Sequence, residues 1–393
     1  MSQLISTDST RLPFADLPPL SLYVHIPWCV RKCPYCDFNS HTTPTRLPEN
    51  AYVDSLLSDL QLELEHIVVR PLSSIFIGGG TPSLFSATAF ARLLAGIQDL
   101  LPWQDAIEIT LEANPGTFEQ AKFAAYRQLG INRLSIGIQS FNDQHLTQLG
   151  RLHNANEAQQ AVAIAQRAGF TNINLDLMHG LPGQDLTQAL ADLTCAIELQ
   201  PNHISWYQLT IEPNTVFWNQ PPVLPEDDSL WDIQQAGQAL LAEQGFIQYE
   251  VSAYAKPNKQ AQHNLNYWQF GDYIGIGAGA HGKISSLDGR ILRYWKTRQP
   301  NDYLNNQRRA GEQLLNNSEL PFEFLMNALR LSKGVPSQLF TQRTGLPLNL
   351  LLESWEQAQS KGLMLSNPRR LAATEQGALF LNDLLQIFLT SSN

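Results

Sequence analysis

Short apolar segments with β-strand character alternate with helical segments about six times in the first 245 residues of this chain. The strand segments are Leu22 to Ile26, Ser74 to Ile77, Ile107 to Leu111, Arg133 to Ile138, Asn172 to Leu177 and His203 to Leu209. Brief, largely apolar strands are typical of a buried parallel sheet. A closed barrel of this kind takes eight strand-helix units. We therefore expect an α/β protein built on an open, incomplete (β/α)6 barrel that ends near residue 245.

A motif of unusual residues follows each of these strand segments. The motifs are three cysteines after the first strand, GGGTPS (78–83), EANPG (112–116), GIQSF (137–141), DLMHGLPG (176–183) and QLTIEP (208–213). In barrels of parallel strands, ligands bind at the carboxyl ends, where the loops converge. The sequence therefore predicts one site that all six loops share.

The three cysteines, Cys29, Cys33 and Cys36, form a C-x3-C-x2-C motif on the loop after the first strand. Their clustering suggests a metal site rather than disulfides. Three thiolates can hold three irons of a [4Fe-4S] cluster, and the fourth iron then keeps an open position for an outside molecule. A structural zinc ion held by the three cysteines and His25 or His41 is the alternative.

Charge and hydropathy exclude several classes of protein. The chain has 393 residues, with 26 basic and 36 acidic side chains and a formal net charge of −10. An acidic balance disfavours general binding to nucleic-acid phosphates. We find neither a leader sequence at residues 1–20 nor eighteen consecutive apolar residues. We therefore expect a cytoplasmic protein, with peripheral association with a membrane as a variant of that location.

The second half of the sequence changes character. A proline-rich stretch at 213–228 leads to a segment at 262–282 that mixes aromatic residues with glycines, and helices follow from residue 321 to the end. The helices suggest a small winged-helix-like domain that packs on protein, because few basic residues cluster there. We expect four parts: an N-terminal extension (1–20), the partial barrel (21–245), a connecting segment (246–320) and a C-terminal, mainly helical domain (321–393).

With these motifs in this order, the sequence resembles the radical S-adenosylmethionine (SAM) superfamily. YVHIPWCVRKCPYCDFNSH (23–41) is similar to the HemN and HemW branch, which contains oxygen-independent coproporphyrinogen III dehydrogenases and haem chaperones. The resemblance extends from Tyr23 to the last helix. It implies a TIM-type radical SAM barrel, a [4Fe-4S] cluster on Cys29, Cys33 and Cys36, and SAM bound to the open iron.

The resemblance further implies that polar and small residues at the strand ends contact SAM. These residues are Tyr23, Tyr35, Gly79, Gly80, Thr81, Glu112, Gln139, Arg151 and Asp176. In the family, the position of Tyr35 lies against the adenine, and the position of Glu112 accepts hydrogen bonds from ribose hydroxyls. From the residues alone, GGG forms a turn more often than a ligand site, and Glu112 fits a salt bridge as well as it fits a ligand contact. Asp176 closes an apolar strand, where an ionisable group is costly without a partner.

Two features separate the members of this branch. The dehydrogenases carry a further cysteine two residues beyond the third, whereas this chain has Phe38 there. The sequence HNLNYW (263–268) matches the HNxxYW motif of the chaperones, which implies haem binding by His263, Asn264, Tyr267 and Trp268. From the residues alone, a turn capped by His263 and Asn264, with Tyr267 and Trp268 in the core, is favoured. Only the resemblance reverses that preference.

The resemblance therefore favours a haem chaperone that binds haem and a SAM-coordinated cluster. Its implied partners are haem and acceptor haemoproteins, among them membrane-bound respiratory enzymes, and a homodimer is one implied state. The alternative is an oxygen-independent coproporphyrinogen III dehydrogenase, a radical SAM oxidative decarboxylase of haem biosynthesis. A radical SAM enzyme for another substrate is a third, weaker alternative. We do not expect dehydrogenase activity, and whether SAM is cleaved stays open.

Overall fold

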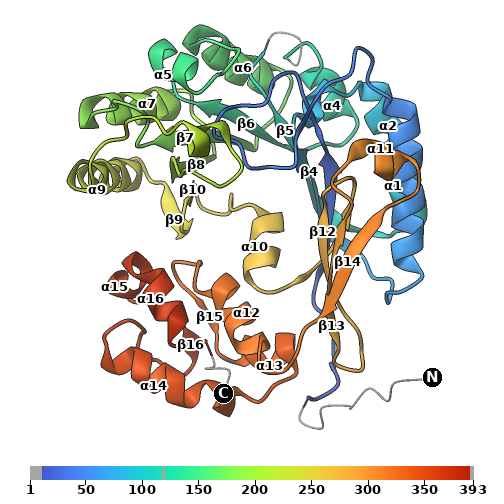
Figure 1. Ribbon diagram of the computed structural model, residues 1–393, viewed down its shortest axis with the longest axis vertical. Coiled ribbons are helices and arrows are strands. Elements are labelled where there is room, and N and C mark those ends of the chain that lie inside the picture. The colour runs from blue at the N-terminus through green and yellow to red at the C-terminus, as the bar shows by residue number, and fades with distance from the viewer. Residues whose placement is uncertain (1–10, 117–119, 390–393) are drawn as a thin grey trace.

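A twelve-stranded sheet forms the frame of the computed structural model, which describes residues 11–116 and 120–389 (Figure 1). The strand order is β14-β13-β12-β11-β1-β4-β5-β6-β7-β8-β10-β9. The strands from β11 to β8 run parallel to their neighbours. The first ten residues of the expected N-terminal extension and the last four of the expected helical domain lie outside the described residues.

The six predicted strands are present and lie side by side in chain order. They are β1 (Leu20–Ile26), β4 (Leu72–Gly79), β5 (Trp103–Ala113), β6 (Arg133–Gln139), β7 (Ile173–His179) and β8 (His203–Gln208). The sheet ends in two separate edges, β14 and β9, and does not close. The prediction of an incomplete α/β barrel is therefore confirmed.

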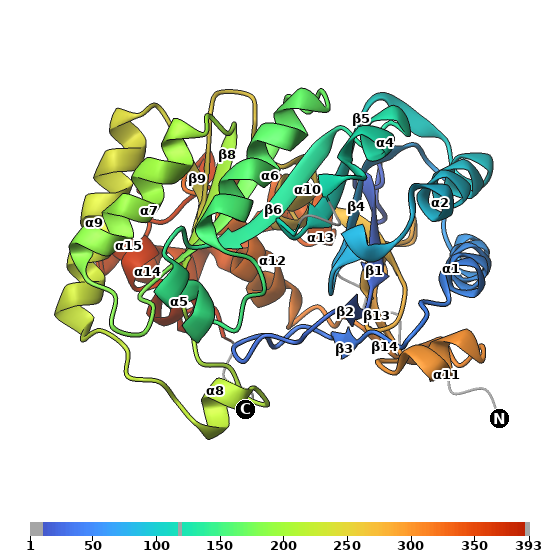
Figure 2. The same cartoon turned by 90° about the horizontal axis from the view of Figure 1, so that it is seen from above.

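Helices cover the outer side of the curved sheet (Figure 2). These helices are α1 (Glu49–Leu64), α2 (Ala87–Leu100), α4 (Phe123–Gln128), α6 (Ala155–Arg167), α7 (Leu186–Glu198) and α9 (Asp227–Glu243). Local sequence fixes where several of them begin. Asn154 and Asp185 form capping boxes with Glu157 and Gln188, which satisfy backbone N–H groups in the first turns of α6 and α7.

Short elements complete the barrel loops. They are β2 (Trp28–Cys29), β3 (His41–Thr42), the 3-10 turn η1 (Pro82–Leu84), α5 (Asp143–Gln148) and α8 (Val216–Asn219). The strands β2 and β3 pair with each other and hold the ends of the cysteine loop together.

Residues 246–320 do more than connect two parts of the chain. They form β9 (Ile247–Glu250), β10 (Ala253–Ala255), α10 (Gln262–Trp268), β11 (Asp272–Ile276), β12 (His281–Ser285), β13 (Ile291–Lys296), α11 (Pro300–Leu304) and β14 (Arg309–Leu314). The first two strands extend the sheet beyond β8, and β11 then joins the opposite side, parallel to β1. Between them α10 contacts β1, β4 and β11 on the inner side of the sheet.

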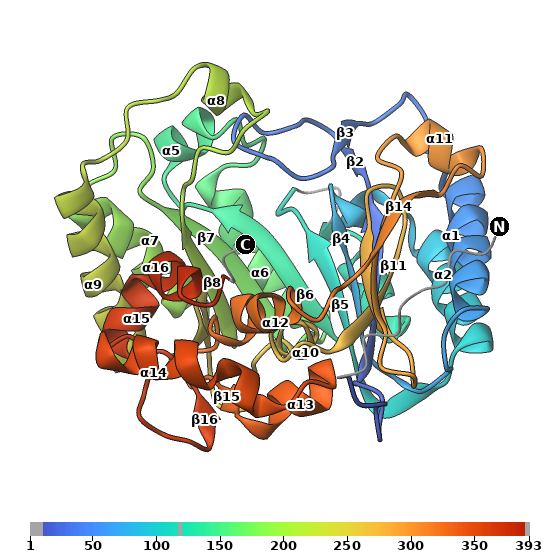
Figure 3. The same cartoon turned by 60° about the horizontal axis from the view of Figure 1, so that its bottom comes forward.

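The C-terminal part is helical, as predicted, and lies beside α10 (Figures 1 and 3). It contains α12 (Leu320–Ala328), α13 (Gln338–Thr344), η2 (Leu348–Leu351), α14 (Leu352–Ser360), α15 (Glu375–Leu379) and α16 (Leu381–Gln386). A two-stranded sheet of β15 (Val335–Pro336) and β16 (Arg370–Leu371) accompanies these helices. No described helix combines the length and apolar content that a bilayer span needs.

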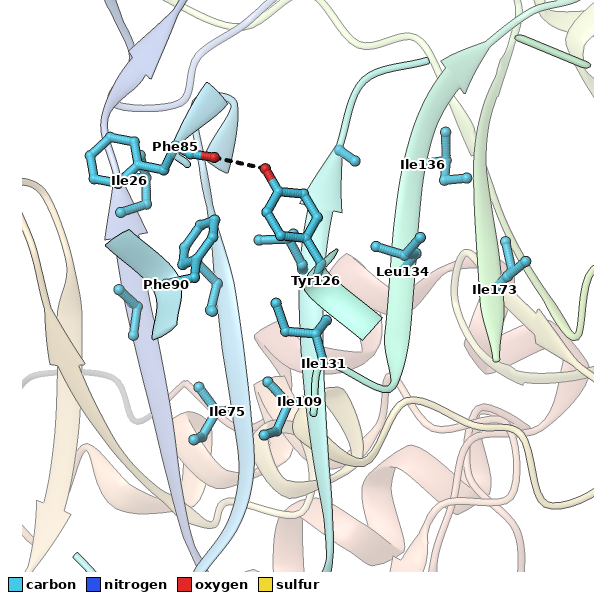
Figure 4. Close-up of a cluster of buried hydrophobic side chains, with 14 of the residues drawn as sticks. Ile26, Ile75, Phe85, Phe90, Ile109, Tyr126, Ile131, Leu134, Ile136 and Ile173 are labelled. Carbon is cyan, nitrogen blue, oxygen red and sulfur yellow. Dashed lines mark hydrogen bonds between the residues drawn. The ribbon is translucent and has the colours of Figure 1, made fainter. Parts of the chain in front are cut away.

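The parallel strands alternate between an apolar outer face and a polar inner face. Ile75, Ile109 and Leu134 point outward and pack under α2 and α4, where Tyr126 donates a hydrogen bond of 2.7 Å to the carbonyl of Phe85 (Figure 4). The intervening side chains point inward, because successive residues of a strand face opposite sides. Buried polar residues such as Ser74, Glu108, Thr110, Ser135 and Asn174 therefore lie on the inner face.

Candidate functional site

A cavity of about 260 Å³ lies at the carboxyl ends of the parallel strands; we call it the polar cavity. All three clustered cysteines line it, together with eight of the nine residues expected to contact SAM. Those eight are Tyr35, Gly79, Gly80, Thr81, Glu112, Gln139, Arg151 and Asp176. The ninth, Tyr23, lines a neighbouring cavity instead. The structure thus brings the strand-end motifs together as the sequence predicts.

Each cysteine sulfur in the loop has a hydrogen-bond donor within reach. Thr81 Oγ1 lies 3.4 Å from the sulfur of Cys29, and Arg151 Nη1 lies 3.6 Å from that of Cys33. Ser40 Oγ lies 3.8 Å from the sulfur of Cys36. Burial raises the pKa of the Cys29 thiol to about 11 when no metal is bound. Hydrogen bonds to thiolate sulfurs are a feature of iron-sulfur sites and tune their reduction potential.

Asn114 links two of these donors, although sequence reasoning gave it no role. Its Nδ2 donates to Thr81 Oγ1 at 2.9 Å, and its Oδ1 accepts from Arg151 Nη2 at 2.7 Å. Arg151 Nη2 also donates to the carbonyl of Gly137 at 2.6 Å. The signal that could have found Asn114 is its place in the EANPG motif, two residues after Glu112.

Two buried carboxylates face the polar cavity. Burial, together with the charge of the nearby Asp176, raises the pKa of Glu112 to about 8, although a hydrogen bond from the Gly79 N–H at 3.0 Å opposes the rise. Burial also raises the pKa of Asp176, whose oxygens accept from Ser135 and Asn174. Carboxylates of this kind are stabilised by a ligand that brings positive charge or hydroxyl donors. SAM carries both.

Backbone geometry opens the polar cavity at two strand ends. A Cβ on Gly80 would lie 2.6 Å from the carbonyl oxygen of Trp28, so this position excludes any side chain. Gln139 adopts a positive φ of 73° at a bulge in β6. This uncommon conformation aims its side chain at the site, where its Oε1 accepts a hydrogen bond from Tyr207 Oη at 2.9 Å.

The alternative of a structural zinc ion finds no support in the geometry. Across residues 11–116 and 120–389, no three His, Cys, Asp or Glu side chains gather around a point that one metal ion could occupy. The ring of His25 is engaged by Tyr23 Oη and the carbonyl of Asn39, both at 2.9 Å. Nε2 of His41 bonds to the carbonyl of Arg298. A cluster spreads its thiolate ligands over several irons, which suits three cysteines that do not converge on one point.

A second cavity of about 460 Å³ adjoins the first; we call it the aromatic cavity. Its walls are Tyr23, His25, Phe38, Asn39, Phe76, His263, Asn264, Tyr267, Trp268, Tyr273, Gly279 and His281. All four residues expected to contact haem are among them. Aromatic side chains dominate, as in a pocket that holds a flat, largely apolar ligand.

The HNLNYW motif lies on α10 rather than in a capped turn. The cavity side of this helix carries His263, Asn264, Tyr267 and Trp268, which are spaced one turn apart in pairs. Asn266 points the other way, is buried, and donates to Ser21 Oγ and to the carbonyl of Asp272, each at 2.9 Å. The motif therefore divides into a cavity side and a core side.

One ring nitrogen of His263 is fixed by the protein. Its Nδ1 lies 3.2 Å from Ser74 Oγ, and its ring packs against Phe76 with centroids 5.1 Å apart. Among the described residues, Nε2 has no hydrogen-bond partner. Burial lowers the pKa of His263 to about 3, so the imidazole is neutral. A neutral imidazole with one free nitrogen can bind a metal.

The two cavities share a wall. Phe38, the residue found where the related dehydrogenases carry a further cysteine, lines both cavities and is 63% exposed. Deeper in the wall, the His25 ring lies against Gly79, where an added Cβ would come within 2.7 Å of the imidazole. Ligands in the two cavities would therefore be close neighbours.

Comparison with known proteins agrees with this arrangement. The radical SAM superfamily model matches residues 23–193, and the HemN C-terminal domain model matches residues 315–380. The chain is 54% identical over 378 residues to the haem chaperone HemW of Haemophilus influenzae, covering 95% of this chain and 99% of that protein. HemW of Escherichia coli is 52% identical over 373 residues, with the same coverage.

A solved structure shows the same fold. Coproporphyrinogen III oxidase (HemN) from Escherichia coli, a radical SAM enzyme, superposes with a TM-score of 0.80. The two sequences are 22% identical, and the match covers 95% of this chain and 91% of that one. At this identity the likeness concerns the fold alone.

Proposed function

This chain belongs to the HemW family of haem chaperones within the radical SAM superfamily, and we propose that it binds haem beside a SAM-coordinated [4Fe-4S] cluster and passes the haem to acceptor haemoproteins. The observation that carries the proposal is the pair of adjoining cavities. One is polar and lined by three cysteines, and the other is aromatic and lined by His263.

In the polar cavity, Cys29, Cys33 and Cys36 would hold the cluster. A bound [4Fe-4S] cluster supplies a one-electron donor and an open iron at which SAM can bind. The hydroxyl of Thr81 and the guanidinium of Arg151 would donate to the sulfurs.

The remaining residues of the polar cavity would hold SAM. Gly79 and Gly80 would admit it close to the backbone, and Tyr35 and Gln139 would line its pocket. Glu112 and Asp176 would accept hydrogen bonds from it. Tyr23 lines the aromatic cavity but lies near enough to Glu112 for the two side chains to interact electrostatically, and it would contact SAM from the shared wall.

In the aromatic cavity, His263 Nε2 would bind the haem iron. Asn264, Tyr267 and Trp268 would line the porphyrin, and Tyr23 and Phe76 would form the floor. The neutral state of His263 suits this role, because a protonated imidazole cannot coordinate a metal. Haem is the cargo, so its site needs an opening through which it can leave. Phe38, at the exposed border of the cavity, is suited to cover that opening.

We propose that the acceptors include membrane-bound respiratory enzymes, that the protein meets them from the cytoplasm, at times at the membrane surface, and that a homodimer is one functional state. We also propose that the chain divides functionally at residues 20, 245 and 320. Two features support residues 246–320 as a functional part of their own. Strands β9 and β10 extend the barrel sheet, and α10 carries the haem motif.

One experiment tests the proposal directly. The full chain is purified without oxygen, its cluster is reconstituted with iron and sulfide, and haem is titrated with absorption as the readout. We expect binding of one haem that is lost in His263→Ala and retained in His66→Ala, which removes an exposed histidine beyond α1. Incubation with coproporphyrinogen III, SAM and a reductant should give no decarboxylated product. Turnover of coproporphyrinogen, or unchanged haem binding by His263→Ala, would overturn the proposal.

A further inference from the structure

A second histidine, His281, stands at the wall of the aromatic cavity and has no role in the function proposed above. We infer that His281 supplies the second axial ligand to the iron of a haem held by His263, so that the haem lies across the cavity between α10 and β12. This inference rests on the proposed haem-binding function and deepens it.

Strand register places His281 in one row with the floor of the cavity. Tyr23 in β1 is level with Phe76 in β4 and with Gly275 in β11. Tyr273 in β11 is opposite Lys283 in the antiparallel β12, so the residue opposite Gly275 is His281. Residues level with one another share a face of the sheet. His281 thus lies two strands, roughly 10 Å, from Tyr23 on the inner face.

Because Gly275 has no side chain, the backbone of β12 approaches β11 more closely there than another residue would allow. A Cβ at Gly275 would lie 1.9 Å from the carbonyl oxygen of His281, so the backbone of His281 closes over a position that has no side chain. The turn before His281 is also fixed. Asn39 Nδ2 donates to the carbonyls of Ala278 and Arg298, both at 2.9 Å. The imidazole is therefore carried by a backbone that is held in place on two sides.

The other candidate ligands in the cavity are already engaged. Both nitrogens of His25 are hydrogen-bonded, to Tyr23 Oη and to the carbonyl of Asn39. Tyr23 is occupied by the same contact. The ring nitrogens of His281, by contrast, have no hydrogen-bond partner among residues 11–116 and 120–389, and its side chain is exposed. Of the three histidines of the cavity, only His263 and His281 are free to bind a metal.

The dimensions and charge of the cavity fit this geometry. A planar ring packed between two walls needs roughly 7 Å between them, twice a carbon–carbon contact distance. The His263 ring lies beside Tyr23, with centroids 6.3 Å apart. The strand register places His281 two strand spacings, roughly 10 Å, from Tyr23, which leaves room for a ring of that thickness. Burial lowers the pKa of His281, and the charges of Arg293 and of the exposed Arg298 lower it too. The guanidinium of Arg298 suits a haem propionate.

The test is the spin state of the ferric haem complex of the full chain, read by absorption and electron paramagnetic resonance. We expect a six-coordinate, low-spin complex in the wild type and in the control His66→Ala. His281→Ala should retain haem but become high-spin, and added imidazole should restore the low-spin spectrum. Imidazole rescue separates loss of a ligand from loss of the fold.

Three results would overturn the inference: a wild-type complex that is five-coordinate, an unchanged low-spin spectrum in His281→Ala, or a high-spin spectrum in His281→Ala that imidazole does not restore. Each of these leaves the proposed function intact as long as the wild type binds haem and His263→Ala does not. Failure of the wild type to bind haem at all would instead overturn the proposed function and the inference together.

Discussion

The polar and aromatic cavities are neighbours, yet the chain builds them in different ways. The polar cavity is assembled from loops that follow β1, β4, β5, β6, β7 and β8 in chain order. The aromatic cavity joins β1 and β4 to α10, β11 and β12, which lie nearly 200 residues further along the chain than β4. One site follows from a repeated local unit, and the other depends on a single long-range strand pairing.

Their chemistry differs accordingly. Buried carboxylates, two arginines and three thiols line the polar cavity, so it suits a charged ligand and a metal cluster. Aromatic rings and neutral histidines line the other, so it suits a flat apolar ligand with a metal at its centre. The shared wall at Phe38 and His25 is where the two chemistries meet. Substitutions on either side of this wall measure how far the two cavities can be separated.

The largest expected effects are two separate losses, in which each of two substitutions removes a different cofactor. Cys33→Ser removes one of three cluster ligands and should abolish the visible absorbance and iron content of the cluster, while haem still binds. His263→Ala should abolish haem binding, while the cluster keeps its visible absorbance and iron content. Because each variant removes a ligand from one cavity only, iron and sulfide analysis combined with haem titration should show two separate losses.

The matched control for Cys33→Ser is Cys195→Ser, since Cys195 lies on α7 away from both cavities. It should keep both cofactors. Retention of the full iron content by Cys33→Ser would contradict the ligand assignment. Simultaneous loss of both cofactors in either variant would show that the cavities form one cooperative site.

The second prediction concerns the long-range pairing itself. Asp272, fully buried at the start of β11, accepts from Lys283 Nζ at 2.8 Å and from Arg70 Nη2 at 2.6 Å. Asp272→Asn leaves the buried Lys283 without a counter-charge, which costs about 3–5 kcal/mol in such sites. Urea denaturation should show a loss of that size in the free energy of unfolding, with haem binding weakened before cluster binding.

A surface carboxylate provides the control for Asp272→Asn. Asp288 pairs with Arg290 at 2.7 Å, and both side chains are more than half exposed. Exposed ion pairs contribute about 0–1 kcal/mol, so Asp288→Asn should change the free energy of unfolding by no more than that. Equal effects of the two substitutions would mean that the β11 junction does not depend on its buried ion pair.

The same contrast explains what the sequence could and could not predict. Six strand segments and their terminal motifs are local patterns, so the partial barrel and most of the polar cavity followed from them. The position of β11 beside β1 is not local, because nothing near Asp272 specifies its partner. The sequence predicts Tyr23 beside SAM; that Tyr23 also lines the aromatic cavity depends on its level neighbours Phe76 and Gly275, which no local pattern specifies.

The helix that carries the haem motif shows a second limit. The residues alone favoured a capped turn, because seven residues with two asparagines make a poor isolated helix. Tertiary contacts decide otherwise: the N–H groups of Gln262 and His263 donate to Glu108 Oε1, and Asn266 is held in the core. Glu108 lies 154 residues before Gln262, so no local pattern could have identified it as the cap.

The third prediction concerns the charge of the polar cavity. Burial raises the folded-state pKa of Glu112 from 4.5 to about 8, so the protein without its cofactors favours the protonated carboxyl. The protonated carboxyl therefore contributes its full stabilisation to the folded state below pH 4.5, and this contribution is lost as the pH rises from 4.5 through 8. Glu112→Gln lacks this loss and should unfold at a higher temperature than the wild type at pH 9, with little difference at pH 5.

Each pKa unit corresponds to roughly 1.4 kcal/mol, so the difference at pH 9 should reach a few kcal/mol. Glu65→Gln, which changes an exposed carboxylate after α1, should melt like the wild type at both pH values. Glu112→Gln should also bind SAM more weakly than the wild type. Identical melting of Glu112→Gln and the wild type at pH 9 would show that Glu112 is ionised at little cost in the free protein.

The smallest effect should come from the hydrogen bond between Thr81 and the sulfur of Cys29. Thr81→Val removes the hydroxyl while keeping the shape of the side chain, and Thr81→Ser keeps the hydroxyl and is the control. A hydrogen bond to the sulfur stabilises the more negative, reduced cluster, so its loss should lower the reduction potential. A bond of about 1 kcal/mol corresponds to roughly 40 mV for one electron. Redox titration should show this shift in Thr81→Val with full iron content and normal haem binding. An equal shift in Thr81→Ser would assign it to packing instead, and altered haem binding would show that the wall between the cavities transmits even this small change.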